Sequence, residues 1–257
     1  CHSLPQQFLC GKLIREGQAV EYLIKHNNLQ LIALHSDMGK ELNEMFGINN
    51  TVVIRNGIDS NKFKYVQESK TEIRKTIGIP ENAFVLGHIG RFSEEKNHHF
   101  LVDVFAEVYR KRPESFLLMI GDGKLVDRIK AQLKKLGLEK HAIILFHRSN
   151  IPRLLKAMDV FVFPSTFEGL GIALIEAQVA GLRCIVSDAV PKEAFQTDLA
   201  IPINLNESPQ KWSEIILDET IKGKSNGNIA YYDMNKEIKR LENLYCRSWS
   251  SPSSPTL

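Results

Sequence analysis

Residues 84–123 read FVLGHIGRFSEEKNHHFLVDVFAEVYRKRPESFLLMIGDG, and this stretch decides the fold. Two continuous apolar runs, at 84–90 and 115–120, flank an amphipathic segment at 97–112. Continuous apolar runs of this length predict strands that are buried on both faces, and a helix between two such strands predicts a right-handed parallel crossover. We therefore expect a βαβ unit within a parallel sheet.

The same alternation of strand and helix continues toward the C-terminus. Further apolar runs predict strands at 142–146, 160–163, 183–187 and 199–203, and the segments between and after them predict helices at 125–136, 151–157, 172–180 and 212–217. The sequence thus predicts an α/β fold with a doubly wound, Rossmann-like parallel sheet. Ligands of such sheets bind at the carboxyl ends of the strands.

The sequence as a whole predicts a chain of four parts. Residues 1–57 contain a strand–helix–strand pattern but are too few for a second lobe of this kind, so we expect the remnant of an N-terminal lobe. Residues 58–217 form the ligand-binding lobe, 218–248 a C-terminal helical segment, and 249–257 (WSSPSSPTL) a disordered tail. The chain starts at Cys1 and not at a methionine, which is consistent with a processed start or with a fragment, and the incomplete N-terminal lobe favours a fragment.

The composition is that of a globular protein. Of the 257 residues, 43% are hydrophobic and 25% charged, and the net charge of +3 is too small to indicate a nucleic-acid partner. No apolar run reaches the roughly 18 residues that a membrane-spanning helix needs. The four cysteines form no CxxC pair, which argues against a zinc or dithiol site and favours a reducing, cytoplasmic compartment.

The loop after the first strand of this sheet is a candidate diphosphate site. Gly90 lets the backbone approach a ligand, Arg91 follows it, and Lys96 lies at the start of the next helix. Two cations beside a helix N-terminus can neutralise a diphosphate without a metal. The alternative is a pair of solvated surface cations. The loop lacks G-x-G-x-x-G, which argues against a nicotinamide dehydrogenase.

Two further loops carry weaker signals. Gly121-Asp122-Gly123-Lys124 lacks the serine or threonine and the upstream glycine of a P-loop, so it predicts a tight turn that lines a ligand cleft. The loop that contains His147 and Arg148 follows the strand at 142–146 and could present its backbone to a base. His147 is as consistent with an exposed histidine as with a ligand contact.

The strongest signal is residues 164–177, PSTFEGLGIALIEA. Gly169 and Gly171 leave backbone N–H groups open at a helix start, where a phosphate can bind. Glu168 precedes this helix, whereas Glu176 lies within it among apolar residues, where a carboxylate needs partners. The hydroxyls of a ribose or another sugar are suitable partners. The alternative is a carboxylate that pairs with an arginine or caps a neighbouring element.

These segments together resemble a known family. NGID at 56–59, the loop at 90–97, GDG at 121–123, MDV at 158–160 and Glu168-x7-Glu176 occur in the order found in the nucleotide-sugar-binding lobe of retaining GT-B glycosyltransferases, the "group 1" family. The resemblance covers about residues 29–217, and IEAQVAGL at 175–182 is similar to a branch of bacterial capsule and exopolysaccharide synthesis. It implies the C-terminal, donor-binding lobe of a GT-B fold, with most of the N-terminal acceptor lobe absent.

The resemblance implies a role for each candidate residue. Arg91 and Lys96 would neutralise the donor diphosphate and take the place of a metal, so no cofactor is expected. Glu168 would hold hydroxyls of the transferred sugar and Glu176 those of the ribose. Gly90 and the backbone amides of Gly169, Leu170 and Gly171 would lie near phosphate and sugar, and His147 and Arg148 would frame the base.

The expected function is therefore transfer of a hexose from a nucleotide-diphosphate sugar, with UDP as the first choice, to a saccharide or lipid-linked acceptor with retention. Such an enzyme would work in the cytoplasm, at the inner face of the membrane where its acceptor is lipid-linked. The main alternative is a truncated, non-catalytic nucleotide-binding or interaction module. A sugar-nucleotide epimerase of the same architecture would lack the Glu168-x7-Glu176 arrangement.

Overall fold

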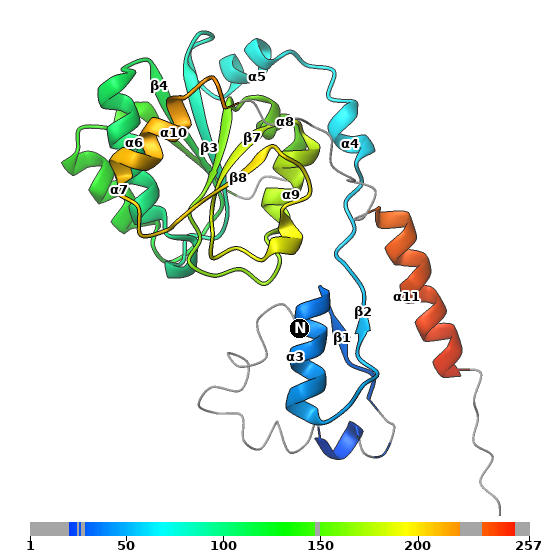
Figure 1. Cartoon of the computed structure of the whole chain (residues 1–257). Coiled ribbons are helices and arrows are strands. Elements are labelled where there is room, and N and C mark those ends of the chain that lie inside the picture. The colour runs from blue at the N-terminus through cyan, green and yellow to red at the C-terminus, as the bar shows by residue number, and fades with distance from the viewer. Residues whose placement is uncertain (1–20, 25, 27–28, 147–149, 222–232, 250–257) are drawn as a thin grey trace, which may run out of the picture. The chain divides into compact units, whose positions relative to one another are not determined.

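The computed structural model describes residues 21–24, 26, 29–146, 150–221 and 233–249 (Figure 1). The chain divides into two compact units. One comprises Cys1–Asp59 together with Ala230–Leu257, and the other comprises Ser60–Ile229. The tail expected at 249–257 lies outside the described residues except for Trp249, the last residue of a helix.

The larger unit contains a sheet of six parallel strands. Their order across the sheet is β5-β4-β3-β6-β7-β8, so the expected α/β fold with a Rossmann-like parallel sheet is confirmed. The strands are β3 (Phe84–Ile89), β4 (Ser115–Ile120), β5 (Ala142–Leu145), β6 (Val160–Phe163), β7 (Arg183–Ser187) and β8 (Ala200–Ile203).

Helices cover both faces of this sheet (Figure 1). On one face lie α6 (His98–Lys111), α7 (Val126–Lys135) and α10 (Pro209–Leu217). On the other lie α5 (Lys70–Thr76), α8 (Ile151–Lys156) and α9 (Ile172–Val179). Short additional helices are α4 (Asn61–Lys64), η1 (Glu94–Lys96), η2 (Glu139–His141) and η3 (Lys192–Ala194).

The direction of winding reverses between β3 and β6. From β3 the chain adds β4 and then β5 on one side, and it then returns to place β6, β7 and β8 on the other side. Loops that follow the two strands at such a reversal diverge and leave a crevice at the carboxyl edge. The loops after β3 and β6 therefore flank the position where an open α/β sheet binds its ligand.

Burial matches the prediction in the centre of the sheet and differs at its edges. All six residues of β4 and all four of β6 are buried. The four residues of β5 are only half-buried, and Pro202 in β8 is exposed. Both are edge strands, where one side has no neighbouring strand and a proline removes no hydrogen bond from the sheet interior.

Asp159 connects α5 to the sheet at the edge opposite the carboxyl ends. Its carboxylate accepts hydrogen bonds from Lys70 Nζ (2.5 Å), from Arg74 Nη2 (2.6 Å) and from the Val85 backbone N–H (2.7 Å). The Arg74 side chain is only 6% exposed, so it requires this counter-charge. The MDV segment at 158–160 is thus structural, because its acid lies at the start of β6.

The described residues of the smaller unit include two short parallel strands and two longer helices, besides a helical turn at 21–24. The elements are β1 (Ile32–Ala33), α3 (Ser36–Phe46), β2 (Val52–Val53) and α11 (Met234–Trp249). The backbone N–H of Arg55 donates to Glu237 of α11 (2.9 Å), and Ile58 forms a bridge with Asp233. The C-terminal segment expected at 218–248 thus contains the helix α11, which packs against residues 55–58, far from it in sequence.

The starts of α3 and α10 are set by their N-caps, and the start of α10 differs from the sequence-based expectation. α3 begins at Ser36 itself, and His35 is its N-cap because His35 Nδ1 accepts from Met38 N–H (3.3 Å). α10 begins at Pro209 and not at residue 212, since the Ser208 hydroxyl accepts from Lys211 N–H and proline suits the first helical position.

The close approach of β4 to β3 at the carboxyl edge predicts a large cost for a side chain at Gly121. A Cβ there would lie 1.9 Å from Gly90 O, and the φ of Gly121 is +153°. Gly121→Ala should therefore lower the free energy of unfolding by about 2–4 kcal/mol in urea denaturation. Gly137 is the control, because its φ is +68° but nothing lies within 4 Å of the added Cβ. Equal losses for the two variants would show that Gly121 is not sterically constrained.

Candidate functional site

The loops after β3 and β6 are joined to each other by hydrogen bonds. The backbone N–H of Thr166 donates to Glu95 O (2.8 Å), and Asn97 Nδ2 donates to Pro164 O (3.2 Å). Asn97 has φ 54° and is the single non-glycine residue with positive φ in the described part of the chain. This left-handed turn directs η1 into α6 and places Lys96 beside the second loop.

An ion pair connects the same two loops. Lys96 Nζ lies 2.6 Å from both carboxylate oxygens of Glu168, and the two side chains are 19% and 7% exposed. The ammonium group also lies 5.5 Å from the centre of the Phe163 ring. Loss of one partner of a buried pair leaves an uncompensated charge, so Lys96 and Glu168 depend on each other in the absence of ligand.

Gly90 and Arg91 lie at the end of β3. A Cβ on Gly90 would be 3.0 Å from His88 Nε2 and 3.4 Å from Cγ and Cδ of Lys96, so the glycine leaves room chiefly for the His88 ring. Arg91 is exposed, and its guanidinium makes no hydrogen bond or ion pair with the described residues. Of the two predicted cations, Lys96 is therefore held in place, whereas the Arg91 side chain extends into solvent.

Two buried histidines lie next to Lys96. His88 Nδ1 donates to Val162 O (2.9 Å), which connects β3 to β6, while His98 stacks on Phe92 with ring centres 4.0 Å apart. Burial lowers the pKa of His88 to about 4 and that of His98 to about 2. Both imidazoles are therefore neutral at physiological pH, and the buried positive charge here belongs to Lys96.

The start of α9 has open backbone amides. Gly171 is its N-cap with φ 81°, and no side chain caps the first turn. Gly169 is half-buried, whereas Leu170 is 3% exposed and Gly171 is buried, so Leu170 anchors the loop and Gly169 leaves part of its backbone accessible. The N-terminus of a helix favours an anion at this position.

Glu176 lies on α9 without a partner. Its carboxylate makes no hydrogen bond or ion pair within the described residues, which argues against the structural alternative of an arginine pair. Burial raises the pKa of Glu176 to about 7. A half-buried, unsatisfied carboxylate is costly, and a ligand that supplies hydroxyl donors would satisfy it.

His147 and Arg148 lie outside the described residues, so their positions are not compared with the prediction. The strand before them, β5, ends beside the turn that follows β4. Gly121 N–H donates to Leu145 O (3.0 Å), and Phe146 is 38% exposed with Lys130 Nζ 5.6 Å from the centre of its ring.

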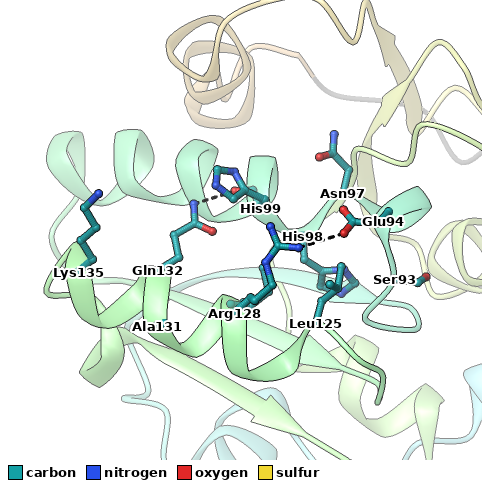
Figure 2. A pocket seen from close by; sticks show the side chains of 11 residues that line it. Ser93, Glu94, Asn97, His98, His99, Leu125, Arg128, Ala131, Gln132 and Lys135 are labelled. Atoms are coloured by element: carbon teal, nitrogen blue, oxygen red, sulfur yellow. Dashed lines mark hydrogen bonds and ion pairs between the residues drawn. The ribbon is translucent and has the colours of Figure 1, made fainter.

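A groove of about 370 Å³ lies between η1, α6 and α7 and contains none of the residues predicted from the sequence (Figure 2). Arg128 pairs with Glu94 across it (3.2 Å), and Gln132 donates to His99 O and to Asp103. Arg128 and the amide nitrogen of Gln132 therefore have partners within or beside the groove, whereas His98 Nδ1 and Nε2 and Gln132 Oε1 are buried without one among the described residues. The carboxyl edge, where Glu176 is unsatisfied, is the better candidate site.

Residues 69–195 match the sequence model of the family "Glycosyl transferases group 1". This segment includes β3 to β7 and both loops at the winding reversal. This segment of the chain is therefore similar to a group 1 glycosyltransferase domain.

Two relatives extend the similarity beyond this domain. EpsF of Bacillus subtilis (strain 168), named as a glycosyltransferase, is 30% identical over 236 residues, 87% of this chain and 61% of EpsF. The "UDP-Gal:alpha-D-GlcNAc-diphosphoundecaprenol alpha-1,3-galactosyltransferase" of Escherichia coli is 30% identical over 206 residues, 75% of this chain and 53% of that protein. The chain thus spans between half and two thirds of the length of these relatives.

Solved structures support the same fold. Anabaena Alr3699/HepE, determined in complex with UDP, superposes with a TM-score of 0.78 at 22% identity and covers 96% of this chain and 71% of its own. WaaG, described as a glycosyltransferase involved in lipopolysaccharide biosynthesis, superposes with a TM-score of 0.75 at 17% identity over 93% of this chain and 69% of its own. The GT-B type of Rossmann-like fold is thereby confirmed.

Two features are absent from the described residues. They contain no helix that is both long and apolar enough to cross a bilayer. They also contain no group of three or more His, Cys, Asp or Glu side chains that could hold a metal ion.

The ion pair between the two loops predicts strong thermodynamic coupling. In a double-mutant cycle, Lys96→Met and Glu168→Gln should each lower the free energy of unfolding. The loss in the double variant should be about 1–3 kcal/mol smaller than the sum of the two single losses. Urea denaturation measures all four proteins. Additive losses would contradict the paired arrangement.

The raised pKa of Glu176 predicts a pH dependence of stability. The stability that the neutral side chain contributes is complete below the ordinary glutamate pKa of 4.5 and is lost as pH rises through about 7. The free energy of unfolding should therefore decline over this range in the wild type and less steeply in Glu176→Gln. Parallel pH profiles from urea denaturation would show that Glu176 is not buried as described.

Proposed function

We propose that the chain is the donor-binding part of a retaining hexosyltransferase, which transfers a sugar from a UDP-sugar to a saccharide or lipid-linked acceptor in polysaccharide biosynthesis. The observation that carries this proposal is the unsatisfied Glu176 carboxylate on α9, whose open N-terminus follows the loop that pairs with Lys96. An anion site and a carboxylate that needs hydroxyl donors, on one helix at a winding reversal, fit a nucleoside diphosphate.

The donor diphosphate binds between the two loops. Lys96 and Arg91 neutralise it from the β3 side, with Gly90 allowing close approach, and the amides of Gly169, Leu170 and Gly171 bind it from the start of α9. Arg91, which makes no ion pair within the described residues, is available for this role. Because these cations supply the positive charge, the reaction needs no metal cofactor.

The two carboxylates bind different parts of the donor. Glu176 accepts hydrogen bonds from the two ribose hydroxyls and Glu168 from hydroxyls of the transferred sugar. Binding of the phosphates draws Lys96 partly away from Glu168, which frees carboxylate oxygens for the sugar. His147 and Arg148 frame the base through their backbone.

In the transfer step, the bond from the sugar C1 to the diphosphate oxygen breaks and a bond from C1 to the acceptor oxygen forms on the same face. The proton of the acceptor hydroxyl passes to the leaving diphosphate. Lys96 and Arg91 stabilise the charge that develops on that diphosphate, and Glu168 positions the sugar without forming a covalent bond. This chemistry requires an acceptor lobe that closes over the sugar and excludes water.

The relatives support the donor class and the setting. The E. coli relative is named for a UDP-galactose donor and a diphosphoundecaprenol-linked acceptor, and the HepE structures contain UDP, UDP-glucose, or UDP and glucose. By analogy we place the reaction in the cytoplasm, at the inner face of the membrane where the acceptor is lipid-linked. The chain covers only 61% and 53% of these two relatives. The second candidate function is therefore a non-catalytic nucleotide-binding module, which would bind donor without turnover.

A thermal-shift panel with UDP, GDP, ADP and NAD tests the donor class. A ligand at about a hundred times its Kd stabilises the native state by about 2.7 kcal/mol, which raises the Tm of a protein of this size by several degrees. UDP should produce this rise and NAD should not. No rise with any nucleotide would contradict a preformed donor site in this chain.

Calorimetric titration separates the roles of the two carboxylates. Glu176→Ala should weaken UDP binding by about 1.5–3 kcal/mol, because two ribose hydroxyls lose a charged acceptor. Glu168→Ala should leave UDP binding nearly unchanged but reduce the preference for a UDP-sugar over UDP. Loss of UDP affinity in Glu168→Ala with none in Glu176→Ala would reverse the assignment.

A further inference from the structure

One buried amide on α9 binds the connection between β7 and β8. Gln178 is fully buried, and its Oε1 accepts from the backbone N–H groups of Gln196 and Thr197 (both 2.9 Å) and from Thr197 Oγ1 (3.2 Å). Its Nε2 donates to Ala194 O (2.7 Å) and to Leu174 O (3.1 Å). A single side chain thus satisfies five backbone or hydroxyl groups.

The connection held in this way packs against the start of α9. Val190 and Ala194 are buried, and they lie 3.6 and 3.8 Å from the position of a Cβ on Gly171. Phe163 at the end of β6 lies 3.4 Å from the same position. Gly171, the N-cap of α9, is therefore enclosed between β6 and the β7–β8 connection, and its position depends on that connection.

We propose that Gln178 is a positioning residue of the nucleotide-sugar site. Its hydrogen bonds to Ala194 and Thr197 keep the β7–β8 connection packed against Gly171. This packing fixes the first turn of α9, whose backbone amides bind the donor diphosphate. This inference rests on the proposed function. Gln178 lies at the opposite end of α9 from those amides and acts through Ala194 and Gly171.

The amide group is specifically suited to this position. Two carbonyl oxygens require a donor, and two N–H groups and a hydroxyl require an acceptor, so a side chain with both is needed. Methionine at this position would fill the volume without any of these bonds. Glutamate would keep the acceptor but direct a carboxylate at the carbonyls of Leu174 and Ala194, unless it is protonated.

The test compares Gln178→Met with Gln132→Met. Gln132 also donates two hydrogen bonds, to His99 O and to Asp103, but it lies on α7 and bonds to neither α9 nor the β7–β8 connection. Calorimetry should show that Gln178→Met weakens UDP binding about tenfold and UMP binding less than about threefold, because the second phosphate depends most on the first turn of α9. Gln132→Met should change neither affinity.

A purely structural role of Gln178 would lower the Tm without changing the ratio of the UMP and UDP affinities, and this result would overturn the inference. Unchanged UDP binding by a folded Gln178→Met variant would also overturn it. Failure of the wild type to bind UDP would instead contradict the proposed function.

If Gln178→Met does not fold, Gln178→Glu provides the second measurement. Its UDP affinity relative to wild type should recover as the pH is lowered and the glutamate becomes a hydrogen-bond donor. A ratio that does not change with pH would overturn the inference.

Discussion

A buried carboxylate must have a positive partner, and Glu168 has Lys96, which is 72 residues away in the sequence. The pair forms across the winding reversal, where the loops after β3 and β6 would otherwise diverge. The hydrogen bonds from Thr166 to Glu95 and from Asn97 to Pro164 support the same closure. The two loops are therefore held together before any ligand binds, so the donor site that we propose is largely formed in advance.

The electrostatics of the site follow from burial. His88 and His98 are neutral because no solvent stabilises their charged forms, so they pack as aromatic groups beside Lys96 and do not compete with it for an anion. Glu176 is half-buried and has no partner in the described residues, and its carboxylate is unsatisfied until a ligand supplies donors. A positive site for phosphate and a separate acceptor for hydroxyls thus lie on neighbouring loops and one helix.

Much of this fold can be predicted from the sequence because its central strands are continuous apolar runs. The strands at 115–120, 160–163 and 183–187 agree with the structure at both ends, and Gly47, Gly137 and Gly181 end helices with φ of 61°, 68° and 77°. Local sequence patterns predict helix starts and strand burial less well where contacts between distant segments determine them. The N-cap His35 is not among the residues that usually cap helices, and the lower burial of β5 reflects its position at the sheet edge. The sequence identifies Lys96, Glu168 and Glu176 as candidates, but not the pairing of the first two nor the role of Gln178, because these contacts join segments that only the folded chain brings together.

The most direct test of this account is a crystal structure of the chain with UDP. The account predicts difference density at the carboxyl edge of the sheet, with the diphosphate between Lys96 and the first turn of α9 and the ribose hydroxyls within hydrogen-bonding distance of Glu176. Density for UDP in the groove between α6 and α7, or a ribose bound away from Glu176, would contradict it.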